Sequence, residues 1–197
     1  MREFQDDTLL IERFQRGDRA AMDALIAKHQ ARAYQYAFRL TKDVEEASDV
    51  VAEAFVRVYR AIGNFKGESQ FTTWLYRILT NCYLDMRKKQ SNRRTTSIHE
   101  AQHMGDGDVQ LQIEDTGPSP HELAESTERW DLISKAVQQL PEYQKAMILM
   151  YHTEHLSYEE IAEALDLPIG TVKSRLNRAR LSMRDLLATE SELFAVA

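Results

Sequence analysis

Apolar side chains recur every three or four residues along most of the chain, a period typical of amphipathic helices. Over residues 5–90 this pattern appears in four segments: around 9–14, and over 19–41, 44–62 and 70–89. The stretch "GNFKGES" separates the last two, because glycines interrupt a helical pattern. Few segments alternate apolar and polar residues in the manner of half-buried strands. The pattern therefore predicts an all-α fold.

The helical period returns near the C-terminus. It predicts helices over 130–140 and 142–156, with Pro141 between them, and a shorter helix that begins at Ser157. This second region and the first are each shorter than ninety residues. Each can therefore bury only a small core of its own.

The segment between the two regions has a different composition. No Lys or Arg occurs from Thr95 to Glu128, whereas eight Asp or Glu residues do, together with the stretches "MGDGD" and "DTGPSP". It has few large apolar side chains, so it lacks the means to form a core. We therefore expect two small helical domains, residues 1–92 and 129–197, joined by an acidic flexible linker, residues 93–128.

The stretch "SYEEIAEALDLPIGTVKSRLNRAR", residues 157–180, has the start and stop signals of two short helices. Ser157 and Glu160 have the spacing of a capping box, in which each side chain bonds the other residue's backbone N–H. The stretch "DLPIG" ends this helix, and Thr171 is the expected N-cap of the next one. Two short helices around a tight turn predict a C-terminal helix-turn-helix.

The second helix of this motif combines an apolar stripe with a basic outer face. Val172, Leu176 and Ala179 fall on one side, and no acidic residue occurs from Ile169 to Arg184. A solvated basic face would explain the charge alone, but the capped helix before it favours DNA as the target. The expected base readers are Lys173, Ser174, Asn177 and Arg178, and the expected phosphate contacts are Thr171, Arg175 and Arg180. Ser157 and Tyr158 complete this candidate DNA-binding surface.

The overall charge limits how the chain binds nucleic acid. Lys and Arg number 25 and Asp and Glu 31, a net charge of −6. This balance excludes a protein that coats nucleic acid indiscriminately, since such binding depends on phosphate neutralisation. Cys82 is the only cysteine, so an intrachain disulfide and a zinc finger are both excluded, and a buried structural thiol is expected. Neither a signal peptide nor a bilayer-spanning apolar run is seen in the sequence, so no membrane insertion and a cytoplasmic location are expected.

Long motif runs in both regions resemble one family. The stretch "LSYEEIAEALDLPIGTVKSRLNRAR" is similar to the C-terminal promoter-binding domain of bacterial extracytoplasmic-function (ECF) RNA polymerase sigma factors of the sigma-E/sigma-W type. The stretches "DVEEASDVVAEAFVRVYRAI" and "FKGESQFTTWLYRILTNCYLDMRKK" are similar to that family's N-terminal promoter-melting domain. The resemblance covers nearly the whole chain in the right order.

The resemblance implies a non-enzymatic subunit that binds core RNA polymerase and directs promoter-specific initiation, with no cofactor and no metal. The C-terminal domain would bind the −35 element and the polymerase flap, and the N-terminal domain would melt and hold the −10 element. The acidic linker would thread toward the active-site cleft and imitate RNA there. An anti-sigma factor is the implied regulator.

The resemblance also implies site residues in the N-terminal domain. The expected −10 contacts lie in the loop and on the helix after it: Asn64, Phe65, Lys66, Gly67, Ser69, Arg77, Asn81, Tyr83, Arg87 and Lys88. Phe71 and Trp74 share the apolar stripe and are expected in the core instead. The expected contacts to the clamp helices of the largest polymerase subunit are Asp49, Glu53, Arg57 and Arg60. Ala52 departs from the family, which commonly has Gln there and makes one polar clamp contact through it.

Two other function classes remain as alternatives. A dimeric transcription regulator would carry a ligand-binding or phosphoacceptor domain upstream, and the first region shows neither strands nor an acidic phosphorylation pocket. A metal hydrolase would be built on His152 and His155, or on His99 and His103, but no glutamate stands in a zincin arrangement beside either pair.

Overall fold

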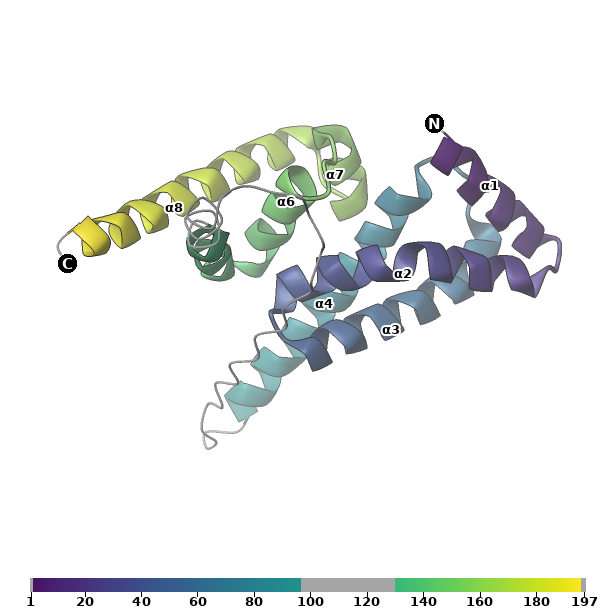
Figure 1. Ribbon diagram of the computed structural model, residues 1–197, viewed down its shortest axis with the longest axis horizontal. Coiled ribbons are helices and arrows are strands. Elements are labelled where there is room, and N and C mark those ends of the chain that lie inside the picture. The colour runs from purple at the N-terminus through teal and green to yellow at the C-terminus, as the bar shows by residue number, and fades with distance from the viewer. Residues whose placement is uncertain (1, 97–129, 196–197) are drawn as a thin grey trace, which may run out of the picture.

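Helices are the regular elements of the computed structural model, which describes residues 2–96 and 130–195, with side chains over 6–92 and 130–188 (Figure 1). No strand occurs within these ranges, so the all-α prediction is confirmed for the part of the chain that is described. The expected linker from residue 97 to 128 lies outside it.

The N-terminal region is a bundle of four helices. Its elements are α1 (Arg2–Gln15), α2 (Arg19–Thr41), α3 (Val44–Ala61), the short 3-10 helix η1 (Ile62–Asn64) and α4 (Phe71–Thr96). Aspartates cap two of the starts: the Asp18 carboxylate accepts from the Ala20 N–H at 3.1 Å, and Asp43 accepts from the Glu46 N–H at 2.8 Å. Both caps satisfy backbone donors that the first helical turn leaves unpaired.

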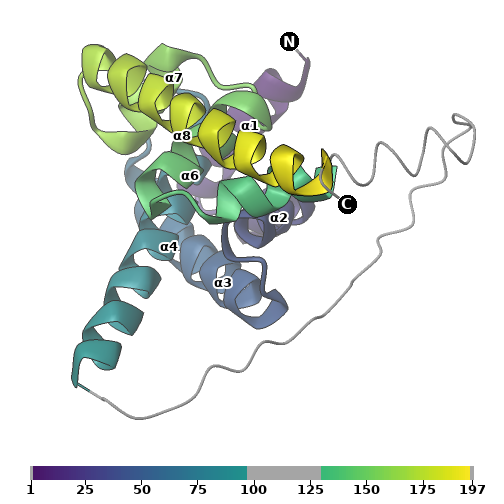
Figure 2. The ribbon, with the colours of Figure 1, turned by 90° about the vertical axis from the view of Figure 1, so that its left-hand side faces the viewer.

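The α4 helix is longer than the sequence pattern predicted. It continues to Thr96, past residue 92, where we expected the linker to begin. Figures 1 and 2 show its last turns projecting beyond α2 and α3.

The C-terminal region contains helical residues 130–138, followed by α6 (Glu142–His152), α7 (Tyr158–Leu165) and α8 (Ile169–Ala195). The capping box at Ser157 is confirmed: its Oγ accepts from the Glu160 N–H, and the Glu160 carboxylate accepts from the Ser157 N–H at 2.8 Å. The α7 helix ends at Leu165, and its C-cap Asp166 adopts the left-handed conformation with φ 53°.

The prediction that Thr171 caps α8 was wrong, because the helix begins two residues earlier, at Ile169. The carbonyl of Pro168 accepts from the N–H groups of Thr171 and Val172 at 2.8 and 3.1 Å. Thr171 therefore lies inside the first turn. A proline immediately before a helix supplies a fixed φ and lacks the N–H that would go unpaired there, which explains the early start.

The two helical regions pack against each other. Buried apolar residues of both belong to one continuous core, and α6 and α7 contact α2 and α4 (Figure 2). Polar contacts join the same faces: the Gln138 amide donates to the Arg39 carbonyl at 2.8 Å, and the Thr73 hydroxyl donates to Glu160 at 3.4 Å. In this state the face of α4 that meets α6 and α7 is covered.

Candidate nucleic-acid interface

The start of α8 presents polar and basic side chains to solvent. Val172, Leu176 and Ala179 are fully buried and fix the rotation of the helix. As a result Lys173, Ser174, Asn177 and Arg178 all point outward and are exposed. The acid-free outer face predicted for a recognition helix is therefore present as a surface in the structure.

Aromatic rings support the basic residues on the two flanks of this surface. The Arg180 guanidinium lies 4.7 Å from the centre of the Tyr151 ring, and it donates to the Tyr158 hydroxyl at 3.4 Å. Arg175 lies 5.6 Å from the centre of the Tyr143 ring on the other side. Such cation–π contacts hold a guanidinium in place while its outer N–H groups stay available. We expect Arg175 and Arg180 to be positioned before DNA arrives.

Charge on this flank shifts two ionisable groups. The hydrogen bond from Arg180 lowers the pKa of Tyr158. Burial lowers the pKa of His152, and the charges of Arg180 and His155 lower it further. Because positive charge contributes to both changes, the flank favours an anion such as a phosphate group.

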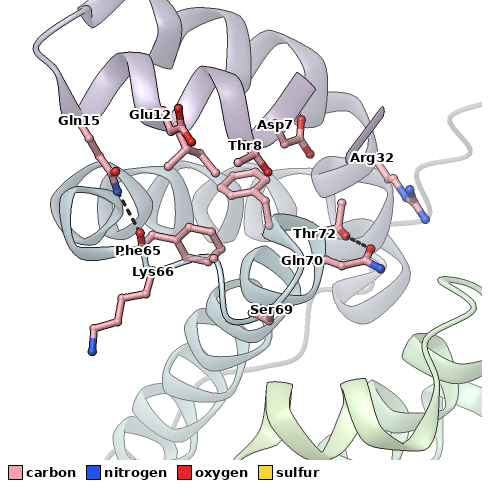
Figure 3. Close-up of a pocket in the computed structure, with 13 residues that line it drawn as sticks. Asp7, Thr8, Glu12, Gln15, Arg32, Phe65, Lys66, Ser69, Gln70 and Thr72 are labelled. Atoms are coloured by element: carbon pink, nitrogen blue, oxygen red, sulfur yellow. Dashed lines mark hydrogen bonds between the residues drawn. The ribbon is translucent and has the colours of Figure 1, made fainter. Parts of the chain in front are cut away.

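A cavity of about 540 Å³ opens between α1 and the loop that precedes α4 (Figure 3). Helices α1, α2 and α4 and the loop before α4 line it, through Asp7, Thr8, Ile11, Glu12 and Gln15 of α1, Arg32 of α2, Phe65, Lys66, Gly67, Ser69 and Gln70 of the loop, and Phe71 and Thr72 of α4. Its volume falls within the range of small-ligand pockets, about 300–1,000 Å³. Four of the predicted −10 residues therefore share one concave surface.

The loop at this cavity is held from α1 and bends at a glycine. The Gln15 side-chain amide donates to the carbonyls of Ile62 and Phe65, both at 3.0 Å. Gly67 has φ 72°, a conformation that glycine adopts without steric cost. The Phe65 ring packs on Phe71 and Trp74, with ring centres 6.4 and 5.0 Å apart. Lys66 points away from the cavity (Figure 3).

Asp7 closes one end of the cavity and is held by Lys28 and His29. Its carboxylate accepts from Lys28 Nζ at 2.7 Å and lies 3.0 Å from His29 Nε2. Burial raises the pKa of Asp7, but the hydrogen bonds from His29 and Lys28 outweigh it, so the pKa lies below its usual value. The sequence pattern did not single out Asp7, Glu12 or Gln15, because the contact of α1 with a loop fifty residues away has no local signal.

The predicted −10 residues on α4 fall on two different faces. Arg77, Asn81 and Lys88 follow one another at helical spacing on the solvent side, where Asn81 and Lys88 are exposed. Tyr83, by contrast, is fully buried, because Glu142 and Lys145 of α6 lie over its hydroxyl. Arg87 is half-buried and pairs with Glu46 at 3.1 Å. Asn64 is exposed but does not line the cavity.

The outer face of α3 carries the residues predicted to contact polymerase. Asp49, Glu53 and Arg60 are exposed, as is Ala52 between them. Arg57 is held in place by Glu53 at 2.8 Å and by Asp85 at 3.0 Å, and these hydrogen bonds raise its pKa. Val56 and Tyr59 are exposed beside them, which gives the face an apolar component.

Features of other function classes are absent from the described residues. Cys82 is buried, and burial raises the pKa of its thiol to about 11, the state of an unreactive structural cysteine. No group of three or more His, Cys, Asp or Glu side chains within the described ranges is placed to hold a metal ion. His99 and His103 lie outside those ranges. None of the described helices has the length and apolarity that a membrane crossing requires.

Solved structures support the fold. The sigma factor RpoE of Bartonella quintana, solved in complex with the anti-sigma factor NepR, matches with a TM-score of 0.63 and 22% identity, over 84% of this chain and 96% of that one. CnrH, solved in complex with the cytosolic domain of CnrY, also matches with a TM-score of 0.63, at 23% identity over 93% and 98% of the two chains.

Sequence comparisons carry the family assignment. The chain matches the models of Sigma-70 region 2 over residues 25–93 and Sigma-70 region 4 over residues 130–183. The RNA polymerase sigma-H factor of Pseudomonas aeruginosa is 39% identical over 180 residues, which cover 89% of this chain and 91% of the relative. The ECF RNA polymerase sigma-E factor of Escherichia coli K12 is 36% identical over 183 residues, 91% and 93% of the two chains. The chain therefore belongs to the ECF family of RNA polymerase sigma factors, which direct core polymerase to initiate at specific promoters through −35 and −10 recognition.

Proposed function

We propose that α8 reads the −35 element through Lys173, Ser174, Asn177 and Arg178. The observation that carries this assignment is the exposed, acid-free outer face of the helix, whose rotation is fixed by buried Val172, Leu176 and Ala179. Arg and Lys suit the acceptors of guanine, and Asn suits adenine. Thr171, Arg175, Arg180, Tyr158 and Ser157 surround this face and hold phosphates, which set the register of the helix on the duplex.

We propose that the cavity of the N-terminal domain holds one base of the −10 element after it leaves the stack. Extruding a base costs a few kcal/mol, which a fitted pocket offsets through hydrogen bonds and stacking. The cavity supplies acceptors at Asp7 and Glu12, donors at Gln70 and Ser69, and the Phe65 ring. Arg77, Asn81 and Lys88 continue this surface along α4 and contact the strand that follows the captured base.

We propose that the outer face of α3 binds the clamp helices of the largest polymerase subunit. Asp49, Glu53, Arg57 and Arg60 supply charge, and exposed Val56 and Tyr59 supply apolar area. Exposed Ala52 leaves out one polar contact of the family without interrupting this face. The C-terminal domain binds the flap.

We propose that the protein works in the bacterial cytoplasm without catalysis of its own, since nucleotidyl transfer belongs to the polymerase. An anti-sigma factor is the expected regulator, because related folds are found in complexes with such proteins.

Replacement of Arg178 by alanine tests the −35 assignment. The variant should lose discrimination between promoters that differ at one −35 base, by about 1–3 kcal/mol, because a bidentate contact to that base is removed. Its affinity for core polymerase should stay unchanged. Run-off transcription on promoters with single −35 substitutions measures the discrimination, and competition with wild type for core polymerase measures the affinity. Uniform weakening on all promoters would instead make Arg178 a phosphate contact.

A further inference from the structure

One carboxylate of the C-terminal domain is buried among three donors of the N-terminal domain. The Glu154 side chain is only 2% exposed. It accepts from Arg32 Nε at 3.3 Å and from Arg39 Nη1 at 3.1 Å, both on α2. The Tyr76 hydroxyl of α4 donates to it as well. A buried carboxylate requires such partners, since desolvation without them is costly.

The backbone around Glu154 is built to present this side chain. The Glu154 N–H donates to the Leu149 carbonyl at 3.0 Å, and the Leu156 N–H donates to the Met150 carbonyl at 3.0 Å. His155 between them is left-handed, with φ 57°. This turn ends α6 and directs Glu154 toward α2, so its position depends on the fold of the C-terminal domain and not on the partner arginines.

A second polar cluster joins the same two faces. The Tyr83 hydroxyl donates to Glu142, Lys145 Nζ donates to the Tyr83 hydroxyl at 3.3 Å, and Lys145 also donates to Gln138 at 3.1 Å. Lys145 is itself buried. Tyr83 is thereby removed from solvent, although it belongs to the helix that we propose follows the −10 strand.

This packed arrangement does not allow one molecule to read both promoter elements. The −35 and −10 elements lie about 25 base pairs apart, which at ~34 Å per ten base pairs is roughly 85 Å. In the structure α7 packs directly on α4. Residues 97–129 number 33, and a chain of that length spans at most about 110 Å. Separation of the two domains is therefore both necessary and within reach of the chain.

We infer that Glu154 is a latch residue, which docks the C-terminal domain on the α2–α4 face in the free protein and must leave Arg32, Arg39 and Tyr76 before the protein engages polymerase and a whole promoter. This inference rests on the proposed function for the need to open. A closed population lowers the apparent affinity for any partner that requires the open form by the fraction that is open. Weakening the latch therefore tightens binding to core polymerase.

Replacement of Glu154 by glutamine tests the latch, because it removes the charge and keeps the shape. Glu163→Gln is the matched control, since Glu163 is an exposed acid on the adjacent α7. Donor and acceptor dyes at Ser48→Cys on α3 and Glu159→Cys on α7 report domain separation. Both positions are exposed, whereas buried Cys82, with its raised pKa of about 11, labels slowly.

The wild-type protein and Glu163→Gln should show one high-transfer population that disappears when core polymerase and promoter DNA are added. Glu154→Gln should show reduced transfer without polymerase and at least threefold tighter binding to core polymerase. Tyr76→Phe keeps the ring and removes one donor to Glu154. Its transfer efficiency and its affinity for core polymerase should lie between those of wild type and those of Glu154→Gln. Circular dichroism and thermal melting establish that each variant is folded.

Equal transfer efficiency in Glu154→Gln and Glu163→Gln would overturn the latch. So would an opened Glu154→Gln protein with unchanged affinity for core polymerase. Run-off transcription at saturating protein distinguishes a failure of the latch from a failure of the proposed function. Wild type and Glu154→Gln should select the same promoters there, and a lack of promoter selection by both would contradict the proposed function while leaving the transfer measurements unaffected.

Discussion

Individual side chains in the two proposed DNA-binding surfaces differ in how firmly they are held. Asn177 and Arg178 project from α8 into solvent, where they can adjust to base edges. Asp7, at the end of the N-terminal cavity, is fixed by Lys28 and His29. We therefore expect substitutions on α8 to change promoter choice with little effect on stability, and substitutions at Asp7 to lower stability.

Replacement of Asp7 by asparagine should destabilise the protein by about 2 kcal/mol at neutral pH, since hydrogen bonds to a charged partner are lost. The pKa of Asp7 is lowered in the folded state, so its contribution is fully present above its unfolded pKa, about 4. That contribution is lost as the pH falls through the lower folded pKa. The difference in the free energy of unfolding between Asp7→Asn and wild type should therefore shrink below pH about 4. Urea unfolding at several pH values measures it.

Asp6→Asn is the matched control, because Asp6 is the exposed neighbour of Asp7. It should unfold like wild type at every pH. A stability difference for Asp7→Asn that stays constant down to acid pH would show that the carboxylate charge is not what holds α1.

Residue contacts across the chain mark the limit of what the sequence predicts. The two partners of the Arg32–Glu154 bond are 122 residues apart, and neither has an unusual local pattern. Tyr83 was expected at the DNA from the family resemblance, but its burial depends on Glu142 of another helix. Spacing along one helix shows which face a residue occupies and leaves open what covers that face.

Elements were predicted more closely than contacts. The α2 helix has the expected bounds, Arg19–Thr41, because Asp18 gives a clear start signal. The start of α8 was misplaced because Thr171 is a good cap by composition, while the helix already begins at Ile169, where the Pro168 carbonyl accepts from the N–H groups of Thr171 and Val172. The end of α4 was placed too early, since its last turns are polar and carry no apolar stripe.

The loop before α4 provides a test at the level of the element. Gly67→Ala should lower stability by about 1 kcal/mol and weaken binding of a −10 single strand, because φ of 72° is strained for a residue with a Cβ. Thermal unfolding and fluorescence anisotropy with a labelled −10 oligonucleotide measure both effects.

Gly63 in the same loop is the control, because its φ is not positive and an added Cβ meets nothing within 4 Å. Gly63→Ala should bind the oligonucleotide like wild type. Equal loss in both variants would indicate that the loop needs general flexibility and not one left-handed residue.

The cap of α7 is a second element that can be tested. Ser157→Ala should reduce stability by about 1 kcal/mol, since the Glu160 N–H loses its acceptor. Ser48→Ala, at an exposed position inside α3, should be neutral or slightly stabilising because alanine favours a helix interior. Urea unfolding measures the free energy of unfolding of both variants. Equal values for the two would mean that the capping box does not stabilise the helix-turn-helix.

The whole molecule is a closed form of a protein whose proposed work needs an open one. Its two domains meet through charges that are only partly shielded, since the Arg32 and Arg39 side chains are 50% and 39% exposed. Salt screens such pairs. Raising the salt from 0.05 to about 0.5 M should therefore increase the open population of wild type and have less effect on Glu154→Gln, as energy transfer would show. If the open fraction of wild type did not change with salt, apolar packing alone would hold the closed form.

The central claim is that this chain gives core RNA polymerase its choice of promoter through α8 and the N-terminal cavity. Run-off transcription by purified core polymerase on a promoter library randomised at −35 and −10 tests it most directly. The protein should enrich one pair of elements, and Arg178→Ala should relax selection at −35 while the −10 preference persists. Transcripts no more selective than those of core polymerase alone would contradict it.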